Sequence, residues 1–381
     1  MHIVVVGAGA FGTWTAHHLQ LAGARVSLVD AYGPASARAS SGDESRIIRC
    51  GYGADEIYSE WARRSLGEWQ TLFDRIGRGH APLFHGCGVL WLSSRDDPYT
   101  EATRATLQGL GYPVAVLDRE ALRRRFAHIE TSDIGSALFE EDCGVLMARR
   151  AVQTLARDLE ARGVRVMQHR VVVPWSSTRL THVRAHDGGE IEGDAFVFAC
   201  GPWLPKVFPE LLGERIRPTR QAVIYFGAPA GDSRFGPAVT PAWVDFAAGI
   251  YGIPDLEHRG VKVGLDRHGP PFDPDSDERV VDAASIGAAR SWLRRRVPAL
   301  ADAPVVESRV CQYENTDTGD FLIDRHPALD NVWIAGGGSG HGFKHAPAIG
   351  AHVASLVLGT GRREPRFALA SRGAAPNRSV Y

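Results

Sequence analysis

The feature that most constrains the fold of this chain is a glycine motif that follows an apolar run at its start. Residues 3–6, IVVV, are typical of a parallel strand that is covered on both faces. Gly7, Gly9 and Gly12 then complete the pattern G-x-G-x-x-G. The first glycine permits a tight turn, the second lets the backbone approach a pyrophosphate, and the third lets a helix pack on the sheet. The pattern predicts a strand, a turn and a helix whose N-terminus binds phosphate.

An acidic residue after the next predicted strand narrows the ligand to a dinucleotide. Residues 25–29 form that strand, and Asp30 follows it. A carboxylate at this place accepts hydrogen bonds from a ribose and disfavours a 2′-phosphate. FAD and NAD both remain open on this motif alone.

A long segment of small residues follows and favours a flavin. Residues 31–53 are rich in glycine, serine and alanine and carry Arg46 and Arg49. An NAD dehydrogenase would continue with another regular strand and helix, whereas a flavoprotein often runs such a loop along its cofactor. The two arginines suit an anion or a flavin oxygen, although arginines at this spacing are also common on a solvated face.

A second glycine-rich loop precedes the last predicted helix. Its glycines crowd seven residues, and Lys344 stands where the helix begins. Such density indicates backbone pressed close to a ligand, although a plain connector with a solvated lysine is the alternative. A turn of small residues at 199–201, after a buried strand, is a further place where backbone can touch a ligand.

The order of the predicted elements indicates an α/β fold with α+β insertions. We expect a discontinuous Rossmann-like nucleotide-binding domain that is interrupted by a mixed-sheet substrate domain. The nucleotide-binding domain is predicted at 1–84, 143–217 and 306–381, and the substrate domain at 85–142 and 218–305. Within them we expect helices at 149–162 and 283–296, charged helical stretches across 97–126, and strands at 222–226, 249–253 and 261–265.

Charge and cysteine usage exclude several classes of partner. The net charge is −1 and the pI is near 7.0, which gives no reason to expect nucleic acid or an anionic membrane. The five cysteines form no CxxC pair and stand near no histidine cluster, so neither a disulfide framework nor a metal site is expected. No apolar run reaches the roughly 18 residues that would cross a bilayer. We therefore expect a small-molecule ligand and a cytoplasmic location.

Six segments together resemble a known family. They are GAGAFG, SRIIRCGYG, ACGPW, GVKVG, CQYENTDTGDFLID and GGGSGHGFKH, in this order. Chains with this series are similar to the monomeric sarcosine oxidase family of FAD-dependent amine oxidases, which includes N-methyltryptophan oxidase. The resemblance implies oxidation of a secondary (N-methyl) or cyclic amino acid by hydride transfer from the amine carbon to flavin N5. Reoxidation by O2 would then give H2O2 and an imine.

The resemblance also implies a covalent flavin and a set of charged site residues. A cysteine at the position of Cys311 forms a thioether with the flavin 8α-methyl group, and Arg309 is close enough to lower the pKa of its thiol. The alternative for Cys311 is a buried cysteine that acts as a small hydrophobe. Arg49 and Lys344 would hold the substrate carboxylate.

Lys262 matches the lysine that this family uses for oxygen, and Arg46 would help it. The alternative for Lys262 is an exposed position on a half-buried strand. Tyr251 and Tyr313 match aromatic residues of the family's substrate cavity, and Trp243 stands where a methionine commonly lines that cavity.

The remaining predictions concern the cofactor site and the departures from the family pattern. The residues expected to bind the cofactor are Gly7, Gly9, Ala10, Phe11, Gly12, Asp30, Ser41, Arg46, Val171, Ala199, Gly201, Trp203, Cys311, Gly337, Gly338, Gly340, His341, Gly342, Phe343 and Lys344. Asp266 stands where the family usually has a histidine, and Ser41 and Gly42 replace a histidine pair, so sarcosine itself is doubtful as substrate. A flavin dehydrogenase with another electron acceptor and a flavin-binding protein without turnover remain as alternatives, and an NAD-dependent dehydrogenase is less favoured.

Overall fold

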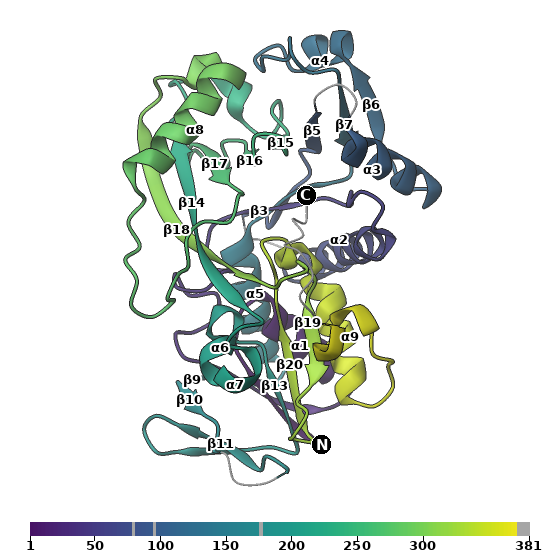
Figure 1. The fold of residues 1–381 in the computed structure, drawn as a ribbon, viewed down its shortest axis with the longest axis vertical. Coiled ribbons are helices and arrows are strands. Elements are labelled where there is room, and N and C mark those ends of the chain that lie inside the picture. Colours follow the sequence, from purple (N-terminus) through teal and green to yellow (C-terminus); the bar gives the residue numbers. More distant parts are fainter. Residues whose placement is uncertain (78–80, 94–96, 175–177, 372–381) are drawn as a thin grey trace.

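The chain forms two large sheets and the helices that cover them (Figure 1). A computed structural model describes residues 1–77, 81–93, 97–174 and 178–371. The predicted α/β fold with mixed-sheet insertions is confirmed.

The first sheet is the nucleotide-binding sheet that the opening motif predicts. Its six strands run in the order β19-β20-β13-β1-β2-β9, and all neighbours are parallel except β19 and β20. Ile3 and Val5 face one side of this sheet, and Val4 and Val6 face the other. The β-branched run is thus buried on both faces. The strands are β1 (His2–Val6), β2 (Arg25–Asp30), β9 (Arg165–Gln168), β13 (Ala195–Phe198), β19 (Leu322–Arg325) and β20 (Val332–Gly336).

Helices share a core with one face of this sheet, and a smaller layer covers the other. The helices are α1 (Ala10–Leu21), α2 (Glu56–Ile76), α5 (Ala148–Ala161) and α9 (Ala346–Val357). Helices α1 and α9 approach closely, since a Cβ at Gly350 would lie 2.5 Å from the carbonyl carbon of Trp14. The smaller layer holds β10 (Val171–Val172), β11 (His182–Ala185), β12 (Glu190–Glu192), α6 (Leu204–Val207) and α7 (Pro209–Leu212).

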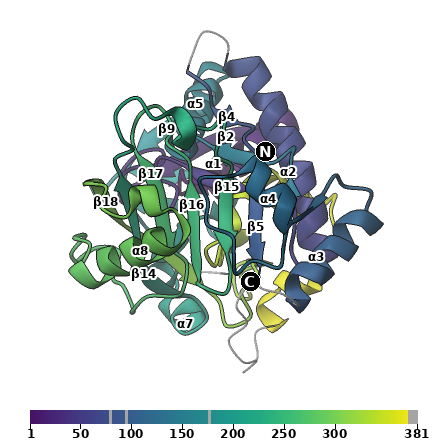
Figure 2. The same ribbon diagram turned by 90° about the horizontal axis from the view of Figure 1, so that it is seen from above.

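The second sheet has eight strands in the order β18-β14-β17-β16-β15-β5-β7-β6. One face packs against α8 (Ala283–Arg296), whose Trp292 and Leu293 lie in a core with Val263 (Figure 2). The opposite face, which carries Trp91 and Val244, joins the core of the first sheet's helices. The strands are β5 (Val89–Ser93), β6 (Ala115–Asp118), β7 (Ser136–Glu140), β14 (Arg217–Phe226), β15 (Ala242–Asp245), β16 (Ile250–Ile253), β17 (Val261–Leu265) and β18 (Val305–Asn315).

A small three-stranded sheet is built from strands that lie, in sequence, between strands of the two large sheets. It consists of β3 (Arg46–Ile48), β8 (Gly144–Leu146) and β4 (Phe84–His85), in the order β3-β8-β4. Strand β3 therefore carries Arg46, and Arg49 follows directly after its end.

The helical stretches predicted across 97–126 are present, whereas three predicted domain boundaries (84/85, 217/218 and 305/306) cut through strands β4, β14 and β18. The predicted helical stretches are α3 (Pro98–Gly109) and α4 (Arg119–Arg125), with β6 between them, and Asp118 caps α4 by accepting from the Ala121 N–H. The domain boundaries stay a prediction. Strand β18 pairs with β14 along its length, so residues 306–315, which we assigned to the nucleotide-binding domain, belong to the second sheet.

No helix in the described part of the chain is both long enough and apolar enough to cross a membrane.

Candidate active site

A cavity of about 560 Å³ opens at the carboxyl ends of the central strands of the first sheet. Its wall includes Gly7 after β1, Asp30 at the end of β2 and Ala199 after β13. Ligands of doubly wound sheets bind at this edge. Strand β18 of the second sheet closes the cavity with Cys311 and Glu314.

The first glycine loop is shaped for close backbone approach. Gly7 has φ +105°, and a Cβ there would lie 2.3 Å from the Ala199 carbonyl oxygen. A Cβ at Gly12 would lie 1.7 Å from the Gly7 oxygen, which confirms the packing role of the third glycine. The N–H of Ala10 donates to Ser41 Oγ at 3.0 Å and so ties the helix start to the loop that carries the arginines.

Asp30 is held by backbone donors at the end of β2. Its two oxygens accept from the N–H groups of Ala8 at 2.7 Å and Tyr32 at 2.8 Å. Burial raises the pKa of Asp30, and these backbone hydrogen bonds oppose that shift. The carboxylate therefore fixes the loop geometry around the cavity.

The second glycine loop meets the first across the cavity. Gly340 has φ +79°, and a Cβ there would lie 2.7 Å from the ring of Tyr313. A Cβ at Gly342 would lie 2.7 Å from the ring of Phe11, which belongs to the first loop. Most of the predicted cofactor residues line the cavity; those that do not are Gly12, Gly337, His341 and Lys344.

Two buried polar atoms at the cavity wall fit a ligand with polar edges. Ser40 Oγ and Glu314 Oε2 have no hydrogen-bond partner among the described residues. Burial raises the pKa of Glu314 to about 7, against the backbone hydrogen bonds of Gly338 and Gly337. An unpaired buried polar group is costly unless a ligand or water satisfies it. The glycine cradle, the acid after β2 and these two atoms fit a flavin dinucleotide.

Cys311 lines the cavity beside a guanidinium group. Its Sγ lies 3.1 Å from Nη2 of Arg46, which also donates to the Ser40 carbonyl at 2.9 Å. Arg309, which we expected to supply this charge, instead lies 3.9 Å from Asp43 and 3.7 Å from Glu44. The cation that contacts the thiol is Arg46, at the start of β3, and the loop before this strand also places the Ser40 carbonyl 3.8 Å from Sγ.

Lys262 is buried in β17, so the exposed alternative for this residue is wrong. Its Nζ donates to the Asp43 carboxylate and, at 2.9 Å, to the Ser45 carbonyl. Burial lowers the pKa of Lys262 to about 8, although Asp43 opposes that shift. Lys262 and Arg46 together hold the pKa of Asp43 far below its usual value, against the effect of burial. Tyr225 donates to the same carboxylate at 3.0 Å.

Arg49 and Lys344 are two buried cations that share one tyrosine. The Arg49 guanidinium lies 4.5 Å from the centre of the Tyr52 ring and 5.0 Å from that of Trp91. Lys344 Nζ donates to Tyr52 Oη at 2.7 Å and to the His341 carbonyl at 3.1 Å, and both acceptors are uncharged. Burial and the neighbouring Arg49 hold the pKa of Lys344 well below its usual value.

No carboxylate among the described residues forms an ion pair with Lys344. Two cations that are buried together attract an anion strongly, because few water molecules offset their charge. Tyr52 Oη also forms a hydrogen bond of 2.8 Å with Nε2 of His345. The arrangement is suited to binding a small carboxylate.

The three predicted aromatic residues have different surroundings. Tyr313 lines the cavity and donates to Asp266 at 2.7 Å. Tyr251 lies near Lys262, with 5.9 Å between the ring centre and Nζ. Trp243 instead stacks on Trp292, with ring centres 5.6 Å apart, in the core beneath α8. Alternation along β15 turns Trp243 away from the face that carries Val244, so we do not retain it as a substrate residue.

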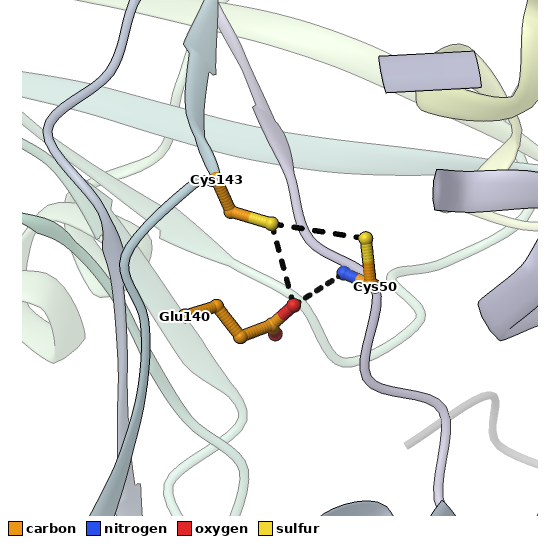
Figure 3. Close-up of side chains that lie close together, drawn as sticks. All are labelled: Cys50, Glu140 and Cys143. Atoms are coloured by element: carbon orange, nitrogen blue, oxygen red, sulfur yellow. Dashed lines mark hydrogen bonds between the residues drawn. The ribbon is translucent and has the colours of Figure 1, made fainter. Parts of the chain in front are cut away.

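Several site residues were missed by reading the sequence, namely Asp43, Tyr52, Glu140 and Glu314. Glu140 belongs to a buried cluster with Cys50 and Cys143 (Figure 3). The two Sγ atoms and a carboxylate oxygen of Glu140 all lie within 4.8 Å of one another. Spacing could not reveal this cluster, because Cys50 is far from the other two in sequence.

The chain resembles known proteins over nearly its whole length. The monomeric sarcosine oxidase of Streptomyces avermitilis is 31% identical over 365 residues, which cover 93% of each chain. The N-methyl-L-tryptophan oxidase of Salmonella heidelberg is 28% identical over 383 residues, which cover 96% of each. The crystal structure of L-proline dehydrogenase from P. horikoshii shares the fold, with a TM-score of 0.85, 20% identity, and coverage of 97% of this chain and 96% of that one.

A family model described as FAD dependent oxidoreductase matches residues 2–356. This range holds both glycine loops, the cavity and the buried cations. The chain therefore belongs to the FAD-dependent oxidoreductase family.

Proposed function

We propose that this protein is an FAD-dependent oxidase of a secondary (N-methyl) or cyclic amino acid, which forms an imine and H2O2. The observation that carries the proposal is the buried pair of Arg49 and Lys344 around Tyr52, which suits a substrate carboxylate. The relatives named as sarcosine oxidase and N-methyl-L-tryptophan oxidase support an N-methyl amino acid as the substrate class.

FAD, when bound, supplies the acceptor for a hydride from the amine carbon and later delivers two electrons to O2. The protein's part is to hold the substrate. Arg49 offers a planar fork of N–H donors, and Lys344 offers a compact positive charge. Fixing the carboxylate between them orients the α-carbon, and such positioning supplies a large part of the rate enhancement.

We further propose that Cys311 is the attachment point of the flavin. Its Sγ lines the cavity and accepts a hydrogen bond from Nη2 of Arg46 at 3.1 Å, which holds the sulfur in place at the cavity wall. Arg46 thus donates to two acceptors, since it also pairs with Asp43.

Lys262 is our candidate for the oxygen half-reaction. A fixed positive charge stabilises the negative charge that develops as O2 accepts an electron. Asp43 keeps the buried ammonium charged by pairing with it. The same ion pair also reduces the net positive charge, and this favours a second candidate: a dehydrogenase that passes electrons to an acceptor other than O2.

A spectroscopic screen tests the proposed function. The purified yellow protein is mixed without oxygen with N-methyl and cyclic amino acids, and with their primary-amine counterparts as controls. We expect bleaching of the flavin absorbance by a member of the first group, and recovery of colour with equimolar H2O2 when air is admitted. Bleaching followed by very slow recovery would identify the dehydrogenase instead. Bleaching by none of these compounds would contradict the proposed substrate class.

A further inference from the structure

Glu140 is a buried carboxylate at the end of β7, directly behind the turn that carries Arg49. We propose that Glu140 is a positioning residue for the carboxylate-binding end of the substrate site. It acts by fixing both the backbone that carries Arg49 and the aromatic wall on which Arg49 lies. This inference rests on the proposed function, because it assigns Arg49 to a substrate carboxylate.

The first contacts hold the backbone after Arg49. Oε2 of Glu140 accepts from the Cys50 N–H at 2.6 Å (Figure 3). Oε1 accepts from the Gly51 N–H at 3.3 Å. The Arg49 guanidinium in turn donates to the Gly51 carbonyl. The peptide units on either side of Cys50 are thus fixed by one carboxylate, and the side chain of Arg49 folds back onto the same turn.

The next contact holds the aromatic wall. Trp91 donates from Nε1 to Oε1 of Glu140 at 2.8 Å, and its ring centre lies 5.0 Å from the Arg49 guanidinium. A Cβ at Gly51 would lie 2.5 Å from the Trp91 ring, so the turn and the ring pack tightly. A shift of the Glu140 carboxylate would therefore move the backbone of Arg49 and the ring under it together.

The two thiols of the cluster complete the surroundings of Glu140. Cys143 Sγ donates to Oε2 at 3.3 Å, and it lies 3.8 Å from Cys50 Sγ. The hydrogen bond with Cys50, with burial and the nearby carboxylate, holds the pKa of Cys143 well above its usual value. A protonated thiol is a weak hydrogen-bond donor. Among the described residues, the two carboxylate oxygens of Glu140 thus accept hydrogen bonds from three N–H groups and one thiol.

Charge supports the same role. Arg49 and Lys344 are both buried, and Arg49 destabilises the charged form of Lys344. Glu140 is one of the groups that raise the pKa of Lys344, and so it offsets part of this repulsion. A carboxylate placed behind the cations can do this without occupying the place where the substrate carboxylate would bind.

The variant Glu140→Gln tests the proposal. The amide keeps the size of the side chain but presents an NH2 group to donors that need an acceptor, and it removes the negative charge. The probe is acetate, whose binding is read from the change it causes in the flavin absorbance spectrum, without turnover. We expect acetate to bind about tenfold more weakly.

A matched pair of compounds separates positioning from general damage. Flavin reduction is followed anaerobically with the amino acid that bleaches the native protein and with the amine that lacks its carboxylate. We expect Glu140→Gln to lose about tenfold in kred/Kd for the amino acid and to stay within about twofold for the amine. Glu120→Gln, the same change at a carboxylate on α4 whose side chain is 80% exposed, should keep both values within about twofold.

The double variant completes the test. In an Arg49→Ala background, Glu140→Gln should have a clearly smaller effect on acetate binding than in the native protein, because the group that it positions is absent and only its charge effect on Lys344 is left. Equal losses for the amino acid and the amine, or an undiminished effect in the Arg49→Ala background, would overturn the inference. If no amino acid bleaches the native protein, the proposed function fails; the acetate titration then still decides whether Glu140 acts on Arg49.

Discussion

The variant Lys262→Met is expected to slow the oxygen half-reaction by roughly 10²–10³-fold while leaving the amino-acid half-reaction nearly unchanged. Methionine is close in size and uncharged, so the change removes the ammonium group with little loss of packing. The charge acts only when O2 accepts electrons, since the substrate carboxylate is assigned to Arg49 and Lys344. Stopped-flow mixing of the reduced protein with O2, and separately of the oxidised protein with substrate, measures the two half-reactions.

The pH dependence gives this prediction its control. Burial lowers the pKa of Lys262 to about 8, so the ammonium is charged below that pH and neutral above it. The native oxygen half-reaction should therefore be fast below about pH 8 and fall as pH rises through that value. Lys262→Met should be slow at all pH values and should lack this step. Equal losses in both half-reactions would contradict the oxygen role.

The variant Arg49→Ala is expected to lower kred/Kd for the amino acid by roughly 10²–10³-fold. The guanidinium is buried among aromatic rings, and its loss leaves Lys344 as the remaining cation for a substrate carboxylate. The oxygen half-reaction should change little, because Lys262 and its partner Asp43 are untouched. The measurement is the substrate dependence of anaerobic flavin reduction.

An exposed arginine serves as the control for this variant. Arg64 pairs with Glu68 on the surface of α2, and its side chain is 55% exposed. Arg64→Ala should leave kred/Kd within about twofold of the native value. A similar loss in both variants, or an unchanged Kd in Arg49→Ala, would remove Arg49 from the carboxylate site.

The glycine loops were predictable because they depend on local backbone conformation. Gly7 and Gly340 have positive φ, and each lies so close to another segment that a side chain would collide with it. Residues of this kind leave a pattern in the sequence, since only glycine meets both demands. The helix at 283–296 was predictable for a similar reason, because Asp282 caps it locally by accepting from the Ser285 N–H.

The carboxylates that support the site could not be predicted from spacing. Asp43 accepts a hydrogen bond from Lys262, although the two residues are far apart in sequence. Glu140 lies on a strand of the second sheet and accepts from the turn after Arg49. Such pairs depend on how the two sheets pack, which no local pattern records. The same reason explains why the expectation of Arg309 beside Cys311 failed: the two share a strand face, but the cation that contacts the thiol is Arg46, which comes from β3.

Acid precipitation of the purified protein tests the central claim most directly. We expect the native protein to be yellow, the flavin to stay with the precipitated chain, and a proteolytic peptide that contains Cys311 to carry it. The variant Cys311→Ala should release its flavin into the supernatant under the same treatment. Complete release from the native protein would contradict the covalent link, and a colourless protein that takes up no FAD would contradict the cavity's assignment to a flavin.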